Sequence, residues 1–207
     1  MDVLLASKNS DKLKEAREIF GNSINILSPE DAKCDIEVIE DGETFEENAK
    51  KKAIEYSIAT GLLTLADDSG LEVDALDGAP GVRSARYAGE EQDPVKNCRK
   101  LLEEMKGVDD AHRTARFKCS VACAKDGKVI FLTIESVEGK ITREMLGDGG
   151  FGYDPIFYYE PYKKTFAQCT QAEKNAISHR GLAFRAAAKT LSGLLDTNVH
   201  DEDTKIV

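Results

Sequence analysis

Residues 116–136 read RFKCSVACAKDGKVIFLTIES, and this stretch is the strongest indication of the fold. It holds two extended runs, residues 116–124 and 128–136, that are rich in β-branched, aromatic and small apolar side chains. The dipeptide Asp126-Gly127 lies between them and is a strong signal for a tight hairpin turn. The stretch therefore predicts two neighbouring antiparallel strands.

Strands and helices alternate in the part of the chain before this hairpin. Three apolar runs are typical of buried strands, at residues 2–6, 24–27 and 62–66. Apolar side chains at helical spacing predict a helix over residues 11–20 and a second one that Thr44 caps and that runs to about Thr60. Alternation favours parallel strands, and the hairpin adds antiparallel ones, so we predict an α/β fold with a mixed central β-sheet flanked by helices.

The remaining segments are expected to complete one domain, residues 1–195. Helices are predicted at residues 93–105 and from Ser178 onward, with a strand at 155–159 between them. Residues 196–207 are polar and are predicted to form a C-terminal tail.

Charge and cysteine content narrow the classes of function. The 28 basic and 38 acidic residues give a net charge of −10, which disfavours a nucleic-acid partner but not a small anion held in a pocket. No apolar run is long enough for a bilayer and the N-terminus does not resemble a signal peptide, so no membrane partner is expected. The five cysteines are scattered, as in proteins of a reducing compartment, and we expect a cytoplasmic protein. Cys119 and Cys123 are interpreted as core residues rather than zinc ligands.

The first candidate motif, Ser7-Lys8-Asn9-Ser10-Asp11-Lys12, joins the first strand to the first helix. Free amides and the positive end of the helix dipole can bind an anion there, and Lys12 can reach phosphate oxygens. An ordinary capped helix with a solvated lysine is the alternative.

The second motif lies on the helix that Thr44 caps. Asn48 and Lys52 are four residues apart and therefore share a face. The acidic pair Glu40-Asp41 just before this helix can supply a metal ligand, or can be surface charge.

The third motif, Ala66-Asp67-Asp68-Ser69-Gly70, follows an apolar strand. Two carboxylates at such a place are costly to bury unless they are paired or bind a cation, and hard oxygen ligands suit Mg²⁺. Neighbouring side chains of a strand point to opposite faces, so one Asp can enter a cleft while the other braces the structure. The alternative is an Asp-rich turn.

The fourth motif, GDGGFGYDP at residues 147–155, contains the pattern G-x-G-x-x-G, but a β-like run follows it instead of a helix, which argues against a dinucleotide fold. We interpret it as a loop that offers Phe151 for stacking on a base, with Asp154 as a nearby acceptor. A hinge with core aromatic residues is the alternative.

The fifth motif, Lys174-Asn175-Ala176-Ile177-Ser178-His179-Arg180, places His179 and Arg180 in the first turn of the last helix. Two cation-forming residues at that end oppose the helix dipole, and this conflict favours a ligand, although a structural pair is the alternative.

Together the five segments resemble the inosine triphosphate pyrophosphatase family, which acts on the aberrant purine triphosphates ITP, dITP and XTP. The matching stretches extend from residue 4 to residue 183: LLASKNSDKLKE, GETFEENAKKKA, LADDSGLEVDALDGAPGVRSARYAG, GGFGYDPIFY and EKNAISHRGLA. The resemblance implies an elongated fold with a substrate cleft between two lobes, a homodimer, and hydrolysis of a purine nucleoside triphosphate to the monophosphate and pyrophosphate with Mg²⁺.

The resemblance also implies roles for individual residues. Asp68 would be the catalytic base, and the Mg²⁺ ligands would be Glu40, Asp67 and Asp68, with Asp41 as the alternative to Glu40. The triphosphate would be held by Ser7, Lys8, Asn9, Ser10, Asp11, Lys12, Lys52 and Lys174. Ser69 would contact the substrate beside Asp68. The base would be held by Phe151, Gly152, Tyr153, Asp154, His179 and Arg180.

Three other functions are alternatives to this reaction. A pyrophosphatase of broad or pyrimidine specificity would differ in its substrates, and a regulatory module would bind nucleotide without cleaving it. A nucleic-acid-binding protein is disfavoured by the net charge of −10 and would show strongly salt-dependent binding.

Overall fold

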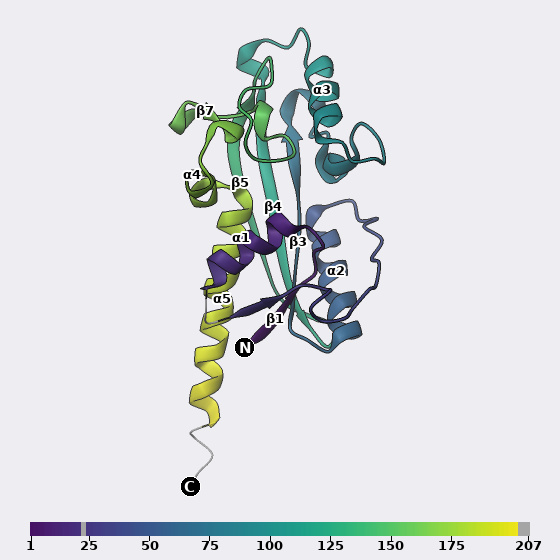
Figure 1. Ribbon diagram of the computed structural model, residues 1–207, viewed down its shortest axis with the longest axis vertical. Helices are drawn as coiled ribbons and strands as arrows, with labels where there is room; N and C mark the ends of the chain where they lie inside the picture. The colour runs from purple at the N-terminus through teal and green to yellow at the C-terminus, as the bar shows by residue number, and fades with distance from the viewer. Residues whose placement is uncertain (22–23, 203–207) are drawn as a thin grey trace.

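The computed structural model describes residues 1–21 and 24–202. The molecule is elongated around one seven-stranded sheet with the order β2-β1-β3-β4-β5-β6-β7 (Figure 1). Its strands are β1 (Asp2–Leu5), β2 (Asn25–Leu27), β3 (Thr64–Val73), β4 (Thr114–Lys125), β5 (Lys128–Ile141), β6 (Phe157–Tyr159) and β7 (Lys164–Thr165). β1 pairs in parallel with β2 and β3, and every later pair is antiparallel. The predicted mixed α/β fold is confirmed.

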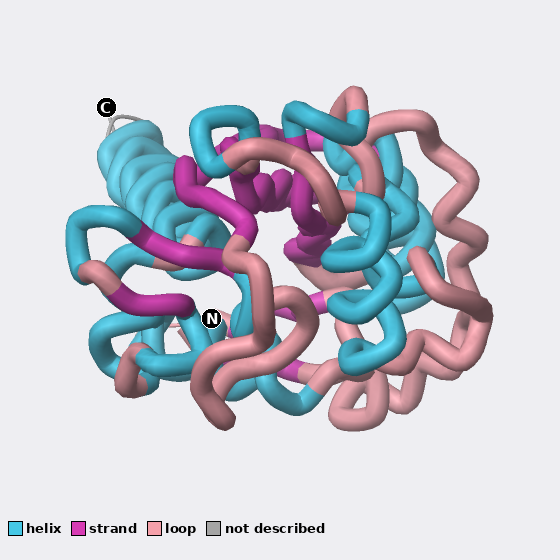
Figure 2. Tube along the Cα trace, turned by 90° about the horizontal axis from the view of Figure 1, so that it is seen from above, coloured by secondary structure: helices cyan, strands magenta, loops and turns pink. Residues whose placement is uncertain are grey.

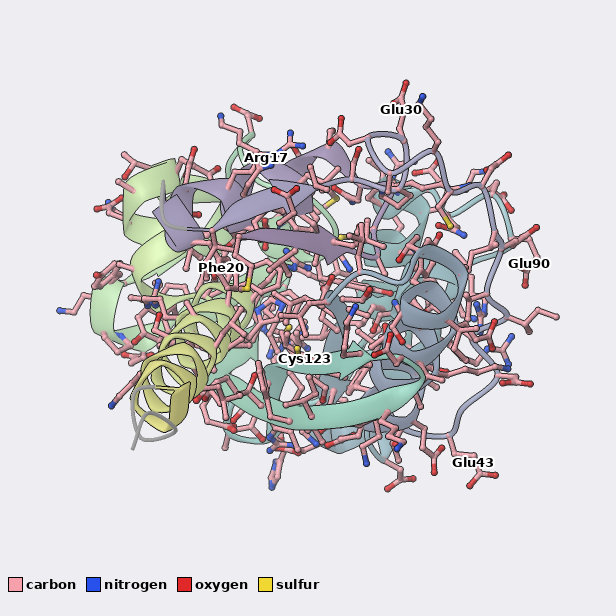
Figure 3. The ribbon with its side chains drawn as sticks, turned by 90° about the horizontal axis from the view of Figure 1, so that it is seen from below. Arg17, Phe20, Glu30, Glu43, Glu90 and Cys123 are labelled. Atoms are coloured by element: carbon pink, nitrogen blue, oxygen red, sulfur yellow. The ribbon has the colours of Figure 1, made fainter. Side chains whose placement is uncertain are left out.

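Helices cover both faces of this sheet (Figure 2). They are α1 (Ser10–Phe20), α2 (Phe45–Thr60), α3 (Pro94–Glu104), α4 (Gln171–Ile177) and α5 (His179–Glu202), with short 3₁₀ turns between them. Seen from below, α1 and α5 lie on one side of the strands and α2 on the other, while Cys123 lies inside and Glu30, Glu43 and Glu90 project outward (Figure 3).

The β4–β5 hairpin has the turn that the sequence predicts. Asp126 and Gly127 adopt φ of 50° and 75°, and two consecutive positive φ values are what a two-residue turn between twisted strands requires. Both strands are longer than predicted, with 12 and 14 residues.

β3 corrects the sequence interpretation. The strand was expected to end at Ala66, before the two aspartates, but it continues to Val73 and pairs with β4 from Thr64 to Val73. The Asp-rich turn does not form, because the long β4 strand supplies hydrogen-bond partners along the whole segment. Gly70 fits the strand because a Cβ there would lie 2.4 Å from Ser84 Oγ.

Three hydrophobic clusters divide the molecule into two lobes. In the lower lobe, Leu65 and Cys119 pack beneath α1 and α5, whereas Ala66 and Ala122 pack beneath α2 on the opposite face. In the upper lobe, a third cluster joins the far ends of β3, β4 and β5 to α3 and to the strand β6. The two lobes therefore share these three strands.

α4 and α5 differ from the helices that the sequence predicts. α4 was missed, and its cap is a Thr170–Glu173 capping box in the sequence. α5 continues through Glu202, so residues 196–202 of the predicted tail are helical, and residues 203–207 lie outside the described part of the chain. Among the described residues, no helix is long and apolar enough to cross a membrane.

Candidate active site

A cleft of about 400 Å³ lies where the two lobes meet. Fourteen of the residues predicted from the sequence line it: Asn9, Asp11, Lys12, Glu40, Lys52, Asp68, Ser69, Phe151, Gly152, Tyr153, Asp154, Lys174, His179 and Arg180. They come from α1, the loop before α2, α2 itself, β3, the loop before β6, α4 and α5, so segments from residue 9 to residue 180 converge on one hollow.

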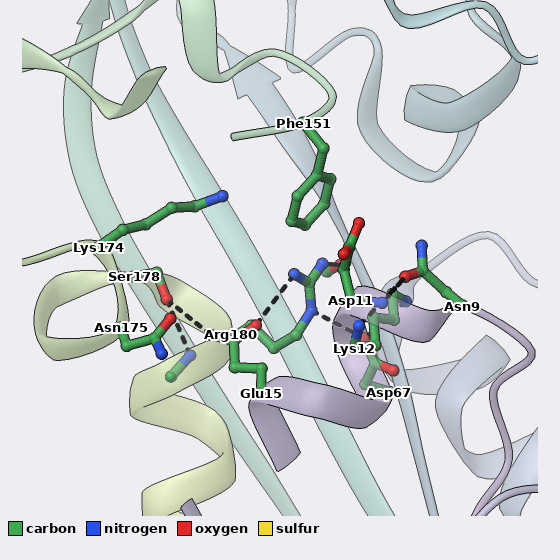
Figure 4. A network of polar contacts seen from close by, with 12 residues as sticks. Asn9, Asp11, Lys12, Glu15, Asp67, Phe151, Lys174, Asn175, Ser178 and Arg180 are labelled. Carbon is green, nitrogen blue, oxygen red and sulfur yellow. Dashed lines mark hydrogen bonds and ion pairs between the residues drawn. The ribbon is translucent and has the colours of Figure 1, made fainter. Parts of the chain in front are cut away.

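Asp67 lies beneath the cleft rather than in its wall. Its side chain is fully buried, and Oδ2 contacts Lys12 Nζ at 2.7 Å and Arg180 Nε at 3.4 Å (Figure 4). Although burial acts to raise the pKa of Asp67, the charges of Lys12, Arg180 and Lys52 hold it well below its usual range. Asp67 Oδ1 is buried without a hydrogen-bond partner. The carboxylate is therefore a permanent anion that fixes two cations.

Asp68 points to the other face of β3 and lines the cleft. Burial raises its pKa from 3.8 to about 6, and the nearby Glu40 carboxylate adds to this shift, while Lys52 and a hydrogen bond from Asn48 oppose it. A carboxylate whose pKa is close to neutrality can accept a proton from water.

Asn48 holds Asp68 in place. Its Nδ2 donates to Asp68 Oδ2 at 3.0 Å, and its Oδ1 accepts from the Gly42 amide at 2.8 Å. The Ser69 amide donates to the other oxygen of Asp68 at 3.0 Å. Asn48 thus joins the candidate base to the loop that carries Glu40. The sequence indicated only that Asn48 lies on the same helix face as Lys52.

Lys52 lies between the acidic groups of the cleft. Its Nζ is 3.1 Å from Glu40 Oε1 and donates to the backbone carbonyl of Asp67 at 2.7 Å. Burial alone would lower its pKa, but Asp67, Glu40 and Asp68 raise it, so Lys52 is charged. Asp41, the alternative to Glu40, is 66% exposed and pairs with Lys51. The geometry therefore favours Glu40 as the acidic neighbour of Asp68.

The N-terminus of α1 differs from the expected free amides. Asn9 caps the helix, and its Oδ1 accepts from the amides of Asp11 and Lys12 at 2.9 and 3.1 Å. Ser7, Lys8 and Ser10 line a separate hollow on the outer side of this loop, and Lys8 pairs there with Asp35 at 2.9 Å. The structure brings Asn9, Asp11 and Lys12 to the cleft, and leaves the other three residues of the motif outside it.

The opposite end of the cleft is formed by an aromatic ring above two cations. Lys174 Nζ lies 4.1 Å from the centre of the Phe151 ring and Arg180 Cζ lies 5.0 Å from it (Figure 4). Lys174 also forms a buried ion pair with Asp154, whose Oδ2 accepts from the Phe151 amide. The sequence grouped Lys174 with the triphosphate, but the structure places it beside the aromatic loop.

The conflict of charges at the start of α5 is resolved by buried partners. Arg180 lies between Asp67 and Glu15, with Arg180 Nη1 3.5 Å from Glu15 Oε2. His179 stacks on Phe117 at 4.6 Å, and burial together with the charges of Arg180 and Lys174 holds its pKa well below its usual value. His179 is therefore a neutral donor or acceptor, and its Nδ1 has no hydrogen-bond partner.

Several cleft residues were not singled out from the sequence. They are Gly70, Ser84, Ala85, Gln92, Pro94, Asn97 and Phe117. Ser84 lies in the segment GAPGVRSARYAG that carries the family resemblance, so that motif was the available signal. Glu15 was also missed, although a glutamate among the inward-facing apolar positions of α1 is itself unusual.

The carboxylates of the cleft can hold a cation if oxygen atoms of the substrate supply the rest of the cation's ligands. No group of three or more His, Cys, Asp or Glu side chains within the described residues could hold a metal ion. Asp68 and Glu40 line the cleft together, whereas Asp67 is already bound by Lys12 and Arg180. Mg²⁺ is commonly held by one or two carboxylates together with substrate phosphates, and this pair suits that arrangement.

Comparison with known proteins places the chain among relatives of matching length. A protein of Desulforamulus reducens named dITP/XTP pyrophosphatase is 48% identical over 98% of this chain and 100% of its own length. A protein of the same name from Clostridium perfringens is 49% identical over 93% and 98%. The solved structure of a HAM1 protein from Coxiella burnetii has a TM-score of 0.86 and 40% identity, and it covers 93% of this chain and 99% of that one.

The Ham1 family model matches residues 3–190, which include all five motifs. The resemblance inferred from those motifs is confirmed. This chain belongs to the Ham1 family.

Proposed function

We propose that this enzyme hydrolyses aberrant purine nucleoside triphosphates, ITP, dITP and XTP, to the nucleoside monophosphate and pyrophosphate. The observation that carries the proposal is Asp68, a buried carboxylate with its pKa raised to about 6, in one cleft with Lys12 and Lys52. The names of the family relatives, dITP/XTP pyrophosphatase, support the same reaction.

In the proposed reaction a water molecule attacks the α-phosphorus and the bond to the bridging oxygen of pyrophosphate breaks. Asp68 accepts the proton of the water, while Asn48 keeps its carboxylate oriented. Lys12 and Lys52 neutralise charge on the phosphate oxygens. Positioning and charge stabilisation are the main requirements of such a transfer, and a protein nucleophile is not needed.

Mg²⁺ is the proposed cofactor, with Glu40 and Asp68 as its protein ligands. When bound, it would neutralise charge on the phosphates and the leaving group. The protein's own contribution is to hold two carboxylates beside Lys52, which is already 3.1 Å from Glu40.

The base is proposed to stack on Phe151, near Gly152, Tyr153 and Asp154. Arg180 and His179 lie at this end of the cleft, and either can donate to a 6-keto oxygen but not to a 6-amino group. A buried donor left unpaired by the wrong base can change selectivity by on the order of 10⁴. These donors therefore favour hypoxanthine and xanthine, which carry a 6-keto oxygen, over adenine.

We also propose a cellular compartment and an oligomeric state for the enzyme. All five cysteines are free, which is typical of the cytoplasm. We also infer a homodimer from the family resemblance, and a single pyrophosphatase domain over residues 1–195.

The test is release of pyrophosphate from ITP, XTP, dGTP and dTTP, each with and without Mg²⁺. The expected result is rapid release from ITP and XTP, only with Mg²⁺. Equal turnover of dTTP would indicate a pyrophosphatase of broad specificity, and binding of ITP without any release would indicate a regulatory module.

A further inference from the structure

Ser84 contacts both ends of the cleft. It is buried, lines the cleft and lies in the 3₁₀ segment Gly81–Arg86. Its side chain contacts the strand that carries Asp68, and its backbone contacts the loop that carries Phe151. These contacts involve different atoms of one residue.

The side-chain contact lies on the edge of β3 that β1 leaves after Leu65. Farther along this edge, the segment before Ser84 approaches β3, with a bridge between Glu72 and Pro80 and a hydrogen bond from the Val73 amide to the Ala79 carbonyl at 3.2 Å. Ser84 Oγ accepts from the Leu71 amide at 2.9 Å and donates to the Gly81 carbonyl at 2.6 Å. A Cβ on Gly70 would lie 2.4 Å from the same oxygen, so Ser84 is pressed against the strand two residues after Asp68.

The backbone contact reaches the loop that carries Phe151, the residue proposed to stack on the purine. Tyr153 is buried, and its hydroxyl donates to the Ser84 carbonyl at 2.8 Å. Asn97 of α3 donates to the same carbonyl at 3.4 Å and to the neighbouring Ala85 carbonyl at 2.9 Å. Tyr153 lies two residues after Phe151, so one hydrogen bond joins the loop that carries Phe151 to Ser84.

We propose that Ser84 is a positioning residue that links recognition of the base to the geometry of Asp68. A purine that stacks correctly on Phe151 would fix the position of Tyr153. Tyr153 would in turn fix Ser84, and Ser84 would fix the part of β3 that follows Asp68. A base that does not stack correctly would leave Asp68 less well placed. Binding energy from the remote part of the substrate is thereby used at the reacting phosphate. This inference rests on the proposed function.

The experiment compares kcat and KM for ITP and ATP, whose bases differ at the 6-position, in Ser84→Ala and in a matched control. Ser57→Ala is the control, because Ser57 Oγ also accepts from an amide, that of Gly127 at 3.0 Å, and donates to a carbonyl, that of Ile54 at 2.8 Å, while Ser57 does not line the cleft. Ser84→Ala is expected to lower kcat on ITP by about tenfold or more, with a smaller change in KM and in ATP turnover. Ser57→Ala is expected to leave the ITP to ATP ratio unchanged.

Tyr153→Phe tests the other arm of the link and serves if Ser84→Ala folds poorly. If the Tyr153–Ser84 and Ser84–Leu71 hydrogen bonds act in series as one link, the double variant should be no slower than the slower single variant. Equal losses on ITP and ATP, or fully additive effects, would overturn the inference. A wild-type enzyme that fails to release pyrophosphate from ITP would instead overturn the proposed function, so the two failures are distinguishable.

Discussion

The two faces of β3 treat adjacent carboxylates in opposite ways. On the face toward α1 and α5, Asp67 is enclosed by Lys12 and Arg180, and its pKa is low. On the face toward α2, Asp68 has a neutral partner in Asn48 and an acidic neighbour in Glu40, and its pKa rises to about 6. Burial is common to both, so the partners decide the sign of the shift.

This difference divides two tasks between two residues of the same type. Asp67 stays ionised and orders cations beneath the cleft, whereas Asp68 can exchange a proton near neutral pH. Titratable groups with pKa values pushed apart are a common sign of assigned roles in catalysis.

The largest expected effect is on turnover in Asp68→Asn. The amide cannot accept a proton from water, so kcat should fall by about 10³-fold or more, while nucleotide binding persists. Pyrophosphate release and calorimetric titration with ITP measure the two quantities. Turnover like that of the wild type would remove the assignment of Asp68 as the base.

The second largest effect is expected on the stability of Asp67→Asn. The substitution leaves Lys12 and Arg180 buried with less counter-charge, so the free energy of unfolding should fall by about 3 kcal/mol. Urea denaturation at pH 7.5 measures it. Asp68→Asn is the matched variant and should be no less stable than the wild type, because it removes a carboxylate whose charged form the fold disfavours. Equal destabilisation by the two variants would contradict the comparison.

The pH dependence should follow the sign of the Asp68 shift. The folded protein binds the proton of Asp68 more tightly than the unfolded chain does, so this group's contribution to stability falls as pH rises from about 4 to about 6 and is constant above. Activity should change the other way, because the base must be deprotonated. kcat/KM should rise through about pH 6 and then level.

Glu40→Gln should move that inflection of kcat/KM to lower pH, because the Glu40 charge raises the pKa of Asp68. It should also raise the Mg²⁺ concentration needed for activity. Asp41→Asn is the control and should change neither quantity, since Asp41 is exposed and paired with Lys51. A larger effect at Asp41 would reverse the choice of acidic ligand.

The smallest effect is expected in Lys8→Ala. Lys8 is 64% exposed and pairs with Asp35 outside the cleft, so kcat/KM for ITP should change by less than about twofold. Lys12→Ala, in the same motif, should reduce it much more. A strong effect at Lys8 would show that the first motif reaches the substrate from both sides.

Local signals predicted much of the fold. Thr44 caps α2 and Gly61 ends it in the left-handed conformation, and Asp126-Gly127 forms the hairpin turn, because these residues act through their own backbone and nearest amides. The end of β3 was not predictable in the same way. Ser69-Gly70 is typical of a turn. The ladder to β4, more than forty residues away, and the Ser84 hydroxyl that accepts from the Leu71 amide hold the segment extended.

In the candidate site, too, the sequence predicted local features but not the contacts between distant elements. The sequence named the residues that converge on the cleft, but not the order of their contacts. That Arg180 is balanced by Glu15 and Asp67, or that Lys174 pairs with Asp154, depends on how α1, α4 and α5 pack against the sheet. Spacing within one element does not contain that information.

The three long strands that pass through both lobes have a mechanical consequence. Rotating one lobe against the other would bend β3, β4 and β5 at once and strain their ladders, and within the described residues no single connecting segment offers a pivot. Closure of the cleft by rotation of a whole lobe is therefore disfavoured, whereas small local shifts of a strand end are not. A narrowing of the cleft around a nucleotide would have to come from wall segments outside these strands, such as the loop that carries Phe151.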